Sequence, residues 1–191
     1  MTLPLANEQV QPAASRVPSG AWTMQLCAWV AVLPLTACVS TPEHATLAEP
    51  APLFSPAAFF SGNTTGEASL KVIFKGSTPV HVMGQGRVEP DGTLVLVQRV
   101  TEGDNAPTTR TWRIRSAGDN RYTGSLTDAE GPIEGDVNGN RLHLRFTAKG
   151  GLGTEQWLYL QAGGQVALNR MVVRKFGVPV ASLEETIRRA Q

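Results

Sequence analysis

The feature that most constrains the fold of this chain is an alternation of apolar and polar residues with a period of two. Residues 141–146 read Arg-Leu-His-Leu-Arg-Phe. Residues 67–75 alternate in the same way except at Ile73, and the pattern places Phe74 on the same face as Leu70. Such alternation is typical of β-strands that have one face inside the protein and one face in water. The sequence therefore predicts an antiparallel sheet.

Short turn sequences separate these runs at regular intervals. Neighbouring Gly, Asn and Asp residues supply the positive φ angles that tight hairpin turns need. They occur at Asp91-Gly92, Gly118-Asp119-Asn120, Asn138-Gly139, Gly150-Gly151 and Gly163-Gly164. Because no long helical period lies between them, parallel βαβ units are not expected. We predict an all-β, antiparallel up-and-down barrel of about 8–10 strands, closed so that no edge strand is exposed.

Two segments carry helical signals. Residues 56–60 are dense in apolar side chains, and we expect a short turn of helix that packs on the barrel. Near the end of the chain, Ser182 and Glu185 form a capping box, and Leu183 and Ile187 have the i,i+4 spacing of a helix face. The same residues can also form the closing strand of the barrel, and the sequence leaves both alternatives open.

The first part of the chain has the organisation of a bacterial export signal. An apolar run over residues 21–35 ends in Leu35-Thr36-Ala37-Cys38, where small residues precede a cysteine. This pattern is typical of a lipobox, whose cysteine is acylated after the preceding segment is removed. We therefore predict a signal peptide at residues 1–37 and a lipid anchor at Cys38. The alternatives are an ordinary cleaved signal peptide or a membrane anchor, although the run is shorter than the roughly 20 residues of a spanning helix.

Residues 38–55 are rich in proline, which favours a flexible tether in front of a folded domain at residues 56–191. The residue after the cysteine is Val39 rather than Asp, which favours a location of the protein at the periplasmic face of the outer membrane. The formal net charge of +1 does not favour a nucleic-acid partner. Cys27 lies in the removed segment and Cys38 carries the lipid, so no disulfide is expected in the mature domain.

Motifs for catalysis or metal binding are not evident. His44, His81 and His143 are far apart and lack metal-ligand spacing, so we expect solvated surface histidines, no metal and no cofactor. The chain has no Gly-x-Ser-x-Gly motif, and we assign no catalytic residue. Four acids between residues 128 and 136 surround a predicted turn, which a solvated hairpin explains.

Two polar residues fall on the inward side of predicted strands. Trp112 and Ile114 are expected to face inward, and this alternation places Arg110 on the inward side as well. Asn169 shares one face of its segment with Met171. An inward-facing arginine can meet a carboxylate headgroup or pair with an acid, and an inward-facing asparagine needs a hydrogen-bond partner. A structural role is the simpler interpretation of both.

A set of short segments occurs in order along the predicted domain: Phe59-Phe60-Ser61-Gly62 with Gly66, Asp91-Gly92-Thr93-Leu94, Arg110-Thr111-Trp112, Tyr122-Thr123-Gly124 with Asp128, the glycines 131, 135 and 139, Gln156-Trp157-Leu158-Tyr159-Leu160, Asn169-Arg170 and Lys175-Phe176-Gly177-Val178. In these segments the chain resembles a family of bacterial lipoproteins of uncharacterised function that have a lipocalin-like (calycin-like) barrel. The chain departs from the family at Glu155-Gln156, where an acidic pair is usual, and at Leu158 and Val173, where methionines are usual. The resemblance implies a fold and a location but no activity.

Three functional hypotheses follow. The first is a lipid-anchored barrel that binds a small apolar ligand, such as a fatty acyl chain or a lipid, in a cavity. Its candidate ligand-binding residues are Arg110, Trp112, Tyr122, Trp157, Tyr159 and Asn169. The second is a structural or interaction protein of the envelope with a filled barrel and an exposed apolar patch. The third is an enzyme acting on lipid, with titratable groups converging in a pocket.

Overall fold

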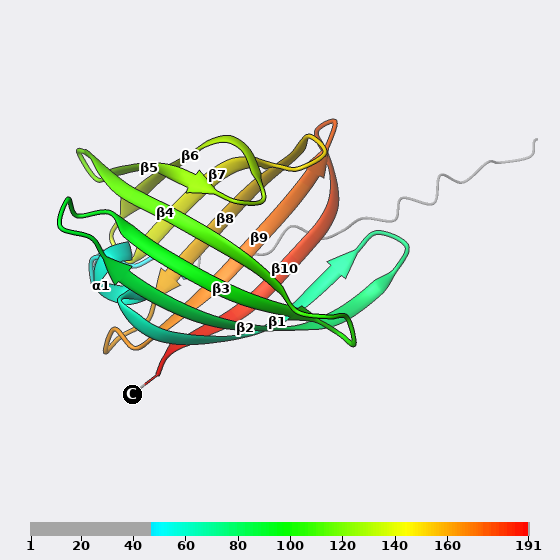
Figure 1. The fold of residues 1–191 in the computed structure, drawn as a ribbon, viewed down its shortest axis with the longest axis horizontal. Coiled ribbons are helices and arrows are strands. Elements are labelled where there is room, and N and C mark those ends of the chain that lie inside the picture. Colours follow the sequence, from blue (N-terminus) through cyan, green and yellow to red (C-terminus); the bar gives the residue numbers. More distant parts are fainter. Residues whose placement is uncertain (1–46, 191) are drawn as a thin grey trace, which may run out of the picture. The chain divides into compact units, whose positions relative to one another are not determined.

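Ten antiparallel strands and one short helix make up the described part of the chain. The computed structural model describes residues 47–190 (Figure 1). The elements are α1 (Pro56–Phe60), β1 (Gly62–Val72), β2 (Gly76–Val88), β3 (Leu94–Glu102), β4 (Thr108–Gly118), β5 (Arg121–Leu126), β6 (Ala129–Asn138), β7 (Arg141–Ala148), β8 (Leu152–Leu160), β9 (Val166–Lys175) and β10 (Val178–Arg189). The predicted strand class and the helical turn at residues 56–60 are both confirmed.

The strands form a closed up-and-down barrel. Each strand pairs with its neighbours in the chain, and β10 pairs with β1 to close the sheet. In that last pair Leu183 lies opposite Leu70, and Ile187 lies opposite Gly66. The alternative that the sequence left open is thus decided in favour of a closing strand. The capping-box pattern is overridden because the segment completes the hydrogen bonding of two strands that are edges without it.

The turns occur where the glycine-rich pairs predicted them. Gly92, Asp119, Asn120 and Gly139 all have positive φ angles, as tight turns between strands require. One detail of the predicted alternation is wrong. Strand β1 ends at Val72, and Phe74 lies in the following turn with its side chain 89% exposed rather than on the inward face.

Helix α1 closes one end of the barrel (Figure 1). Ser55 caps it by accepting a hydrogen bond from the Ala58 backbone N–H, and proline occupies its first turn. The helix delivers Phe59 and Phe60 into the core, where their rings meet edge to face with centroids 4.9 Å apart. It lies so close to β2 that a methyl group on Gly86 would overlap the Phe60 carbonyl oxygen. The lack of a side chain at Gly86 therefore allows α1 to pack against β2.

The segment before the helix is also attached to the barrel. Asn140 is 2% exposed, and its side chain accepts a hydrogen bond from the Glu49 N–H and donates one to the Leu47 carbonyl. Phe54, which is 1% exposed, donates its N–H to the Gly139 carbonyl at 2.9 Å. The last half of the predicted tether, residues 47–55, is thus attached to the domain by hydrogen bonds.

The expectations for the N-terminal region lie outside the described residues. These are the signal peptide at residues 1–37, the lipid anchor at Cys38 and the first part of the tether. Within residues 47–190, no helix combines the length and apolarity needed to cross a bilayer.

The barrel interior differs between its two ends. At the end closed by α1, the core is fully buried and apolar, with members such as Leu94, Leu142 and Ala167. At the opposite end, the inward-facing side chains Leu70 and Leu183 are only half-buried. A band of polar side chains lies between the two regions, and this band forms the candidate site.

Candidate functional site

The polar band begins with an arginine, a glutamine and a tryptophan on neighbouring strands. Gln98 on β3 lies directly opposite Arg110 on β4, so both side chains enter the interior. The Gln98 Oε1 accepts hydrogen bonds from Arg110 Nε at 2.9 Å and from Trp112 Nε1 at 2.8 Å. The guanidinium also lies 5.7 Å from the centre of the Trp112 ring, within cation–π range. Gln98 thus holds one edge of the guanidinium, whereas its two terminal nitrogens donate no hydrogen bond to a residue in the described range 47–190.

The band continues with a carboxyl and an amide on β9 and β10. Asn169 and Glu185 face each other across these strands, and Asn169 Nδ2 donates to Glu185 Oε2 at 2.7 Å. Their exposed fractions are 1% and 6%. The Glu185 carboxyl group lies against the backbone of β1 at Gly66, and a methyl group at that position would overlap it. The Asn169 Oδ1 atom is fully buried and has no hydrogen-bond partner, which is a costly state for a buried acceptor.

Burial shifts the ionisation of the charged members of the band. Desolvation raises the pKa of Glu185, while the hydrogen bond from Asn169 and the positive charge of Arg110 act in the opposite direction. Desolvation also lowers the pKa of Arg110, although that group remains a cation at physiological pH. Arg110 and Glu185 attract each other when both are charged. The interior thus holds a cation near a carboxyl group whose ionisation is disfavoured by desolvation.

Two small cavities flank the band. The one toward α1 has a volume of about 20 Å³ and the one toward the open end about 70 Å³, and Arg110, Gln156 and Glu185 line both. The larger cavity continues to the apolar side chains Leu70 and Met171. These volumes hold water molecules or one small chemical group, whereas drug-sized ligands occupy about 300–1,000 Å³. Neither of these two cavities has space for a whole acyl chain.

The structure brings together three of the six candidate ligand-binding residues. Arg110 and Trp112 belong to the polar band directly, and Asn169 joins it through Glu185. The inward position predicted for Arg110 is confirmed. The structural role favoured for Asn169 accounts for its Nδ2 group, which donates to Glu185, but not for its Oδ1 atom, which has no hydrogen-bond partner.

The other three candidates lie elsewhere. Trp157 and Tyr159 alternate with the inward-facing Leu158, so they project from the opposite face of β8 and do not line either interior cavity. Tyr159 is nevertheless only 1% exposed, and burial raises its pKa. Tyr122 packs against the core from β5 without lining either cavity, and burial raises its pKa as well.

Sequence reasoning missed three members of the band. Gln98 interrupts an inward-facing apolar series, which is the same signal that identified Arg110 and Asn169. On β8, Gln156 precedes the inward-facing apolar residues Leu158 and Leu160. Glu185 was hidden because its segment also fitted a capping box, in which a glutamate lies at the helix surface.

The raised pKa of Glu185 leads to a prediction about stability. The carboxyl group keeps its proton to higher pH in the folded protein than in the unfolded chain, so stability falls as pH rises through that interval. Glu185→Gln removes this titration. The quantity to measure by calorimetry is the difference in thermal midpoint, variant minus parent. We expect this difference to increase as pH rises above about 4.5, because only the parent loses stability from the ionisation of Glu185. The exposed neighbour Glu184→Gln is the control, and a relative midpoint for Glu185→Gln that is flat or falls with pH would contradict the assignment.

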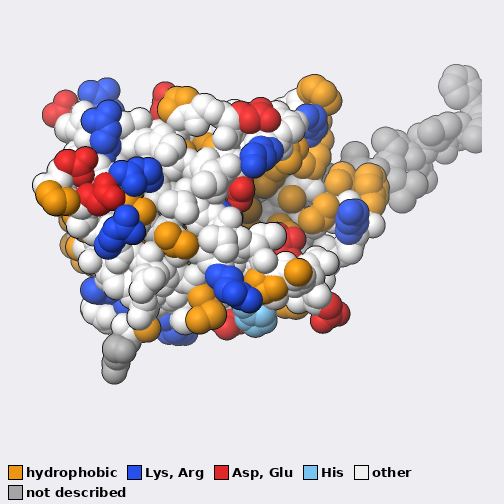
Figure 2. All heavy atoms as spheres, viewed as in Figure 1, with side chains coloured by type: hydrophobic (Ala, Val, Ile, Leu, Met, Phe, Trp, Pro, Cys, Tyr) orange, Lys and Arg blue, Asp and Glu red, His pale blue; other side chains and the backbone are white. Residues whose placement is uncertain are grey.

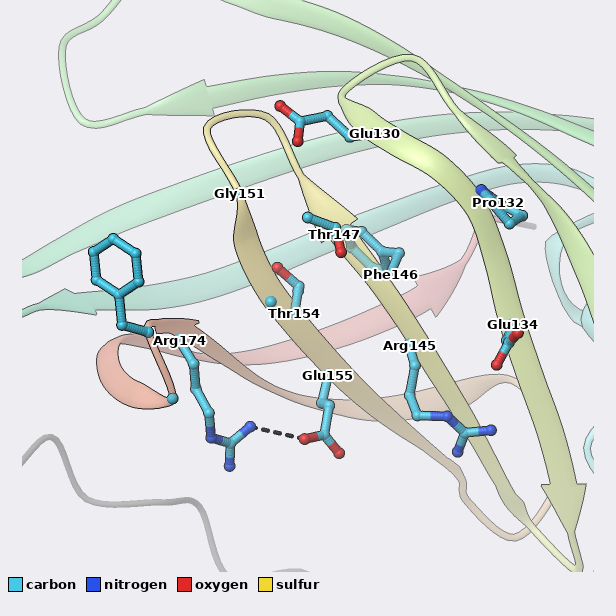
Figure 3. A pocket seen from close by; sticks show the side chains of 13 residues that line it. Glu130, Pro132, Glu134, Arg145, Phe146, Thr147, Gly151, Thr154, Glu155 and Arg174 are labelled. Atoms are coloured by element: carbon cyan, nitrogen blue, oxygen red, sulfur yellow. Dashed lines mark hydrogen bonds and ion pairs between the residues drawn. The ribbon is translucent and has the colours of Figure 1, made fainter.

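A wide hollow lies on the outer wall of the barrel. It has a volume of about 660 Å³ and is open to solvent between β6, the β7–β8 hairpin and the β9–β10 turn (Figure 3). The β6–β7 pairing is irregular between Glu130 and Glu134, where Pro132 interrupts the ladder. Two of the lining charges pair with each other, since Arg174 donates to Glu155 at 2.8 Å. This groove is an open, charged depression, and the enclosed polar band is the stronger candidate for holding a ligand.

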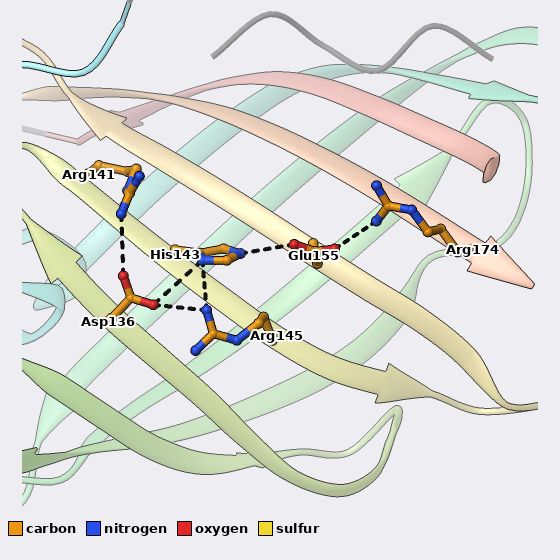
Figure 4. Close-up of polar contacts among 6 residues, drawn as sticks. All are labelled: Asp136, Arg141, His143, Arg145, Glu155 and Arg174. Atoms are coloured by element: carbon orange, nitrogen blue, oxygen red, sulfur yellow. Dashed lines mark hydrogen bonds and ion pairs between the residues drawn. The ribbon is translucent and has the colours of Figure 1, made fainter. Parts of the chain in front are cut away.

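A row of charged side chains extends from this groove across four strands (Figure 4). Its members are Asp136 on β6, Arg141, His143 and Arg145 on β7, Glu155 on β8 and Arg174 on β9. His143 lies between two carboxylates, 3.5 Å from Asp136 and 3.2 Å from Glu155. Its ring also stacks on Trp157 with centroids 4.9 Å apart.

This environment corrects the expectation of a solvated surface histidine. The His143 side chain is only 13% exposed, and desolvation together with the charge of Arg145 lowers its pKa despite the two carboxylates. The cross-strand pairs of the row explain its charges as a structural feature of the outer wall. Within residues 47–190 no group of three or more His, Cys, Asp or Glu side chains has the arrangement of a metal site.

Comparisons with known proteins agree with the fold. The S-type phycobiliprotein lyase of Guillardia theta is similar in structure, with a TM-score of 0.58 and 8% identity over 70% of this chain and 90% of the lyase. A protein of unknown function from the DUF3598 family of Nostoc punctiforme has a TM-score of 0.55 and 13% identity over 74% of this chain, which spans about half (51%) of that protein. At such identities the likeness shows the fold alone, which is a barrel of the lipocalin-like type.

Sequence comparison is more specific. No curated protein matches the chain. The family model described as protein of unknown function (DUF3833) matches residues 32–189, which include every strand of the barrel. The chain therefore belongs to the DUF3833 family.

Proposed function

We propose that this protein binds an amphipathic small molecule, such as a fatty acid, with its polar end at Arg110 and its apolar chain toward the open end of the barrel. The observation that carries the proposal is a half-buried cation beside a buried carboxyl group and a buried, unpaired amide oxygen inside an apolar barrel. Burying such groups lowers stability unless they are fully paired. The terminal nitrogens of Arg110 and the Oδ1 atom of Asn169 are the groups that a ligand would pair.

The dimensions of the interior define how such a ligand lies. The cavity of about 70 Å³ accommodates an end group such as a carboxylate, but not the chain attached to it. The chain would contact the apolar side chains between this cavity and the open end. Leu70, Met171 and Leu183 line the cavity on that side and are only half-buried, so they offer apolar surface to a ligand.

The lipocalin-like fold supports this proposal by analogy. Small up-and-down barrels can hold one small ligand in their interior. Fold likeness alone does not establish function, and the identity of the ligand rests on the chemistry of the polar band.

The small cavities favour one alternative, a structural or interaction protein whose barrel is filled by its own side chains. In that case Arg110 and Glu185 interact with each other, water fills the two small cavities, and the protein binds no small-molecule ligand. We assign no catalytic residue in either case.

We also propose that the domain is held at the periplasmic face of the outer membrane by a lipid on Cys38. The support is the Leu35-Thr36-Ala37-Cys38 pattern after an apolar run. Membrane fractionation of Cys38→Ala tests this point. An unchanged membrane-bound and processed variant would overturn the anchor without affecting the ligand proposal.

Ligand binding is tested by titrating the full chain with dodecanoate and, as the matched probe, dodecanol. Saturable binding of the acid, with weaker binding of the alcohol, supports the proposal because Arg110 distinguishes a carboxylate from a hydroxyl group. Equal affinities would overturn the role of Arg110. No saturable binding of either compound would favour the filled barrel.

A further inference from the structure

Two phenylalanine side chains project into solvent at the open end of the barrel. Phe74 in the β1–β2 turn is 89% exposed, and Phe176 in the β9–β10 turn is 93% exposed. Val178 beside the second turn is 58% exposed. In Figure 2, apolar side chains gather around the hollow at this end of the molecule. Such exposure leaves large apolar surfaces in water without any packing gain in the folded domain.

The backbone at both phenylalanines is also unfavourable for their residue type. Phe74 has a φ of 64° and Phe176 a φ of 50°, both in the left-handed region. Glycine and asparagine occupy such turn positions readily, whereas a bulky residue there is uncommon. Phe176 precedes Gly177, where Asn-Gly would be the favoured pair for a two-residue hairpin. Neither folding nor turn geometry therefore explains the two aromatic side chains.

All the lysines of the chain lie at the same end. The four lysines are Lys71 and Lys75 at the β1–β2 turn, Lys149 at the β7–β8 turn and Lys175 at the β9–β10 turn. In the strand order β2-β1-β10-β9-β8-β7, these three turns are consecutive around the rim. The remaining turns of that rim carry the acids Glu102, Asp104 and Asp128. The rim is thus divided into a basic, apolar side and an acidic side.

We propose that this basic side of the rim, defined by Phe74, Phe176 and the four lysines, docks on an anionic lipid surface. Aromatic side chains on protruding turns can enter the headgroup region without a large preformed groove. Lysine stems lie along apolar surface while their ammonium groups reach phosphates. The Lys175 ammonium lies 5.0 Å from the centre of the Phe176 ring, which combines both features in one turn.

The arrangement favours a bilayer over a protein partner. The two phenylalanines lie on separate turns, whereas a protein interface usually has one contiguous buried centre. The acidic side of the rim would be repelled by anionic lipid, so docking would occur on one side of the opening. The inference does not depend on ligand binding, although docking here would place the open end of the barrel beside lipid.

The test uses tryptophan as a local probe of insertion. In the full chain, Phe74 and Phe176 are replaced singly by Trp, and the matched control is Met83→Trp, at a side chain that is 66% exposed on β2. Emission is measured as the difference from the parent, with vesicles of phosphatidylglycerol and brominated phosphatidylcholine. We expect emission at positions 74 and 176 to shift to shorter wavelength and to be quenched, and emission at position 83 to stay unchanged. This readout is local, so binding of vesicles by another part of the chain does not mimic it.

The charge requirement is tested in the Phe176→Trp background. Lys75→Gln and Lys149→Gln are each expected to raise the lipid concentration for half-maximal quenching about five-fold. Absence of quenching at positions 74 and 176, or equal quenching at position 83, would overturn the docking surface. Equal quenching with purely zwitterionic vesicles would overturn the anionic preference. A blue shift that depends on protein concentration and not on lipid would identify a second copy of the chain as the occupant instead.

Discussion

Phe59→Ala is expected to lower the free energy of unfolding of the barrel by about 3–5 kcal/mol. The Phe59 side chain is 3% exposed, and its ring lies 5.6 Å from that of Phe54 and 4.9 Å from that of Phe60. Removing it leaves a cavity between α1 and the barrel, and two rings lose their packing partner. Denaturant unfolding followed by circular dichroism measures the change.

The matched control for this variant is Phe74→Ala, the same chemical change at a side chain that is 89% exposed. It is expected to change stability by less than about 0.5 kcal/mol. If the two variants lost similar amounts of stability, or if Phe59→Ala were nearly neutral, α1 would not be an integral part of the core.

Arg110→Met should weaken the binding of dodecanoate by about 10- to 100-fold, because the ligand loses a charged hydrogen-bond donor worth about 1.5–3 kcal/mol. Methionine keeps much of the apolar stem, and Gln98 keeps its hydrogen bond from Trp112, so the barrel should remain folded. Arg115→Met on the same strand is the control, since Arg115 is exposed. Equal affinities for the two variants would remove Arg110 from the site.

The strand pattern made most of the fold predictable. Period-two alternation identifies the inward face of a strand that has one apolar and one polar face, and it correctly placed Trp112, Ile114 and Arg110 inside. The turn sequences indicated where strands connect, because the positive φ angles of tight turns are a local requirement that glycine, asparagine and aspartate meet. The alternation does not mark where a strand ends, so Phe74 was placed in the interior although it lies in a turn.

The candidate site was less predictable because it depends on contacts between distant strands. Glu185 meets Asn169 across β9 and β10, and only the closing strand brings it inside. The local sequence fitted a helix equally well. On β8 the sequence showed that Trp157 and Leu158 lie on opposite faces, but both faces carry large apolar residues. Which face was inward could not be determined until the neighbouring strands were placed.

The most direct test of a ligand site at the polar band is carbon NMR of dodecanoate labelled at its carboxyl carbon and mixed with the full chain. The account predicts a separate resonance for the bound carboxylate, present with the parent and with Arg115→Met and lost or strongly reduced with Arg110→Met. A spectrum with only the free-ligand resonance, or a bound resonance that is unchanged in Arg110→Met, would contradict it.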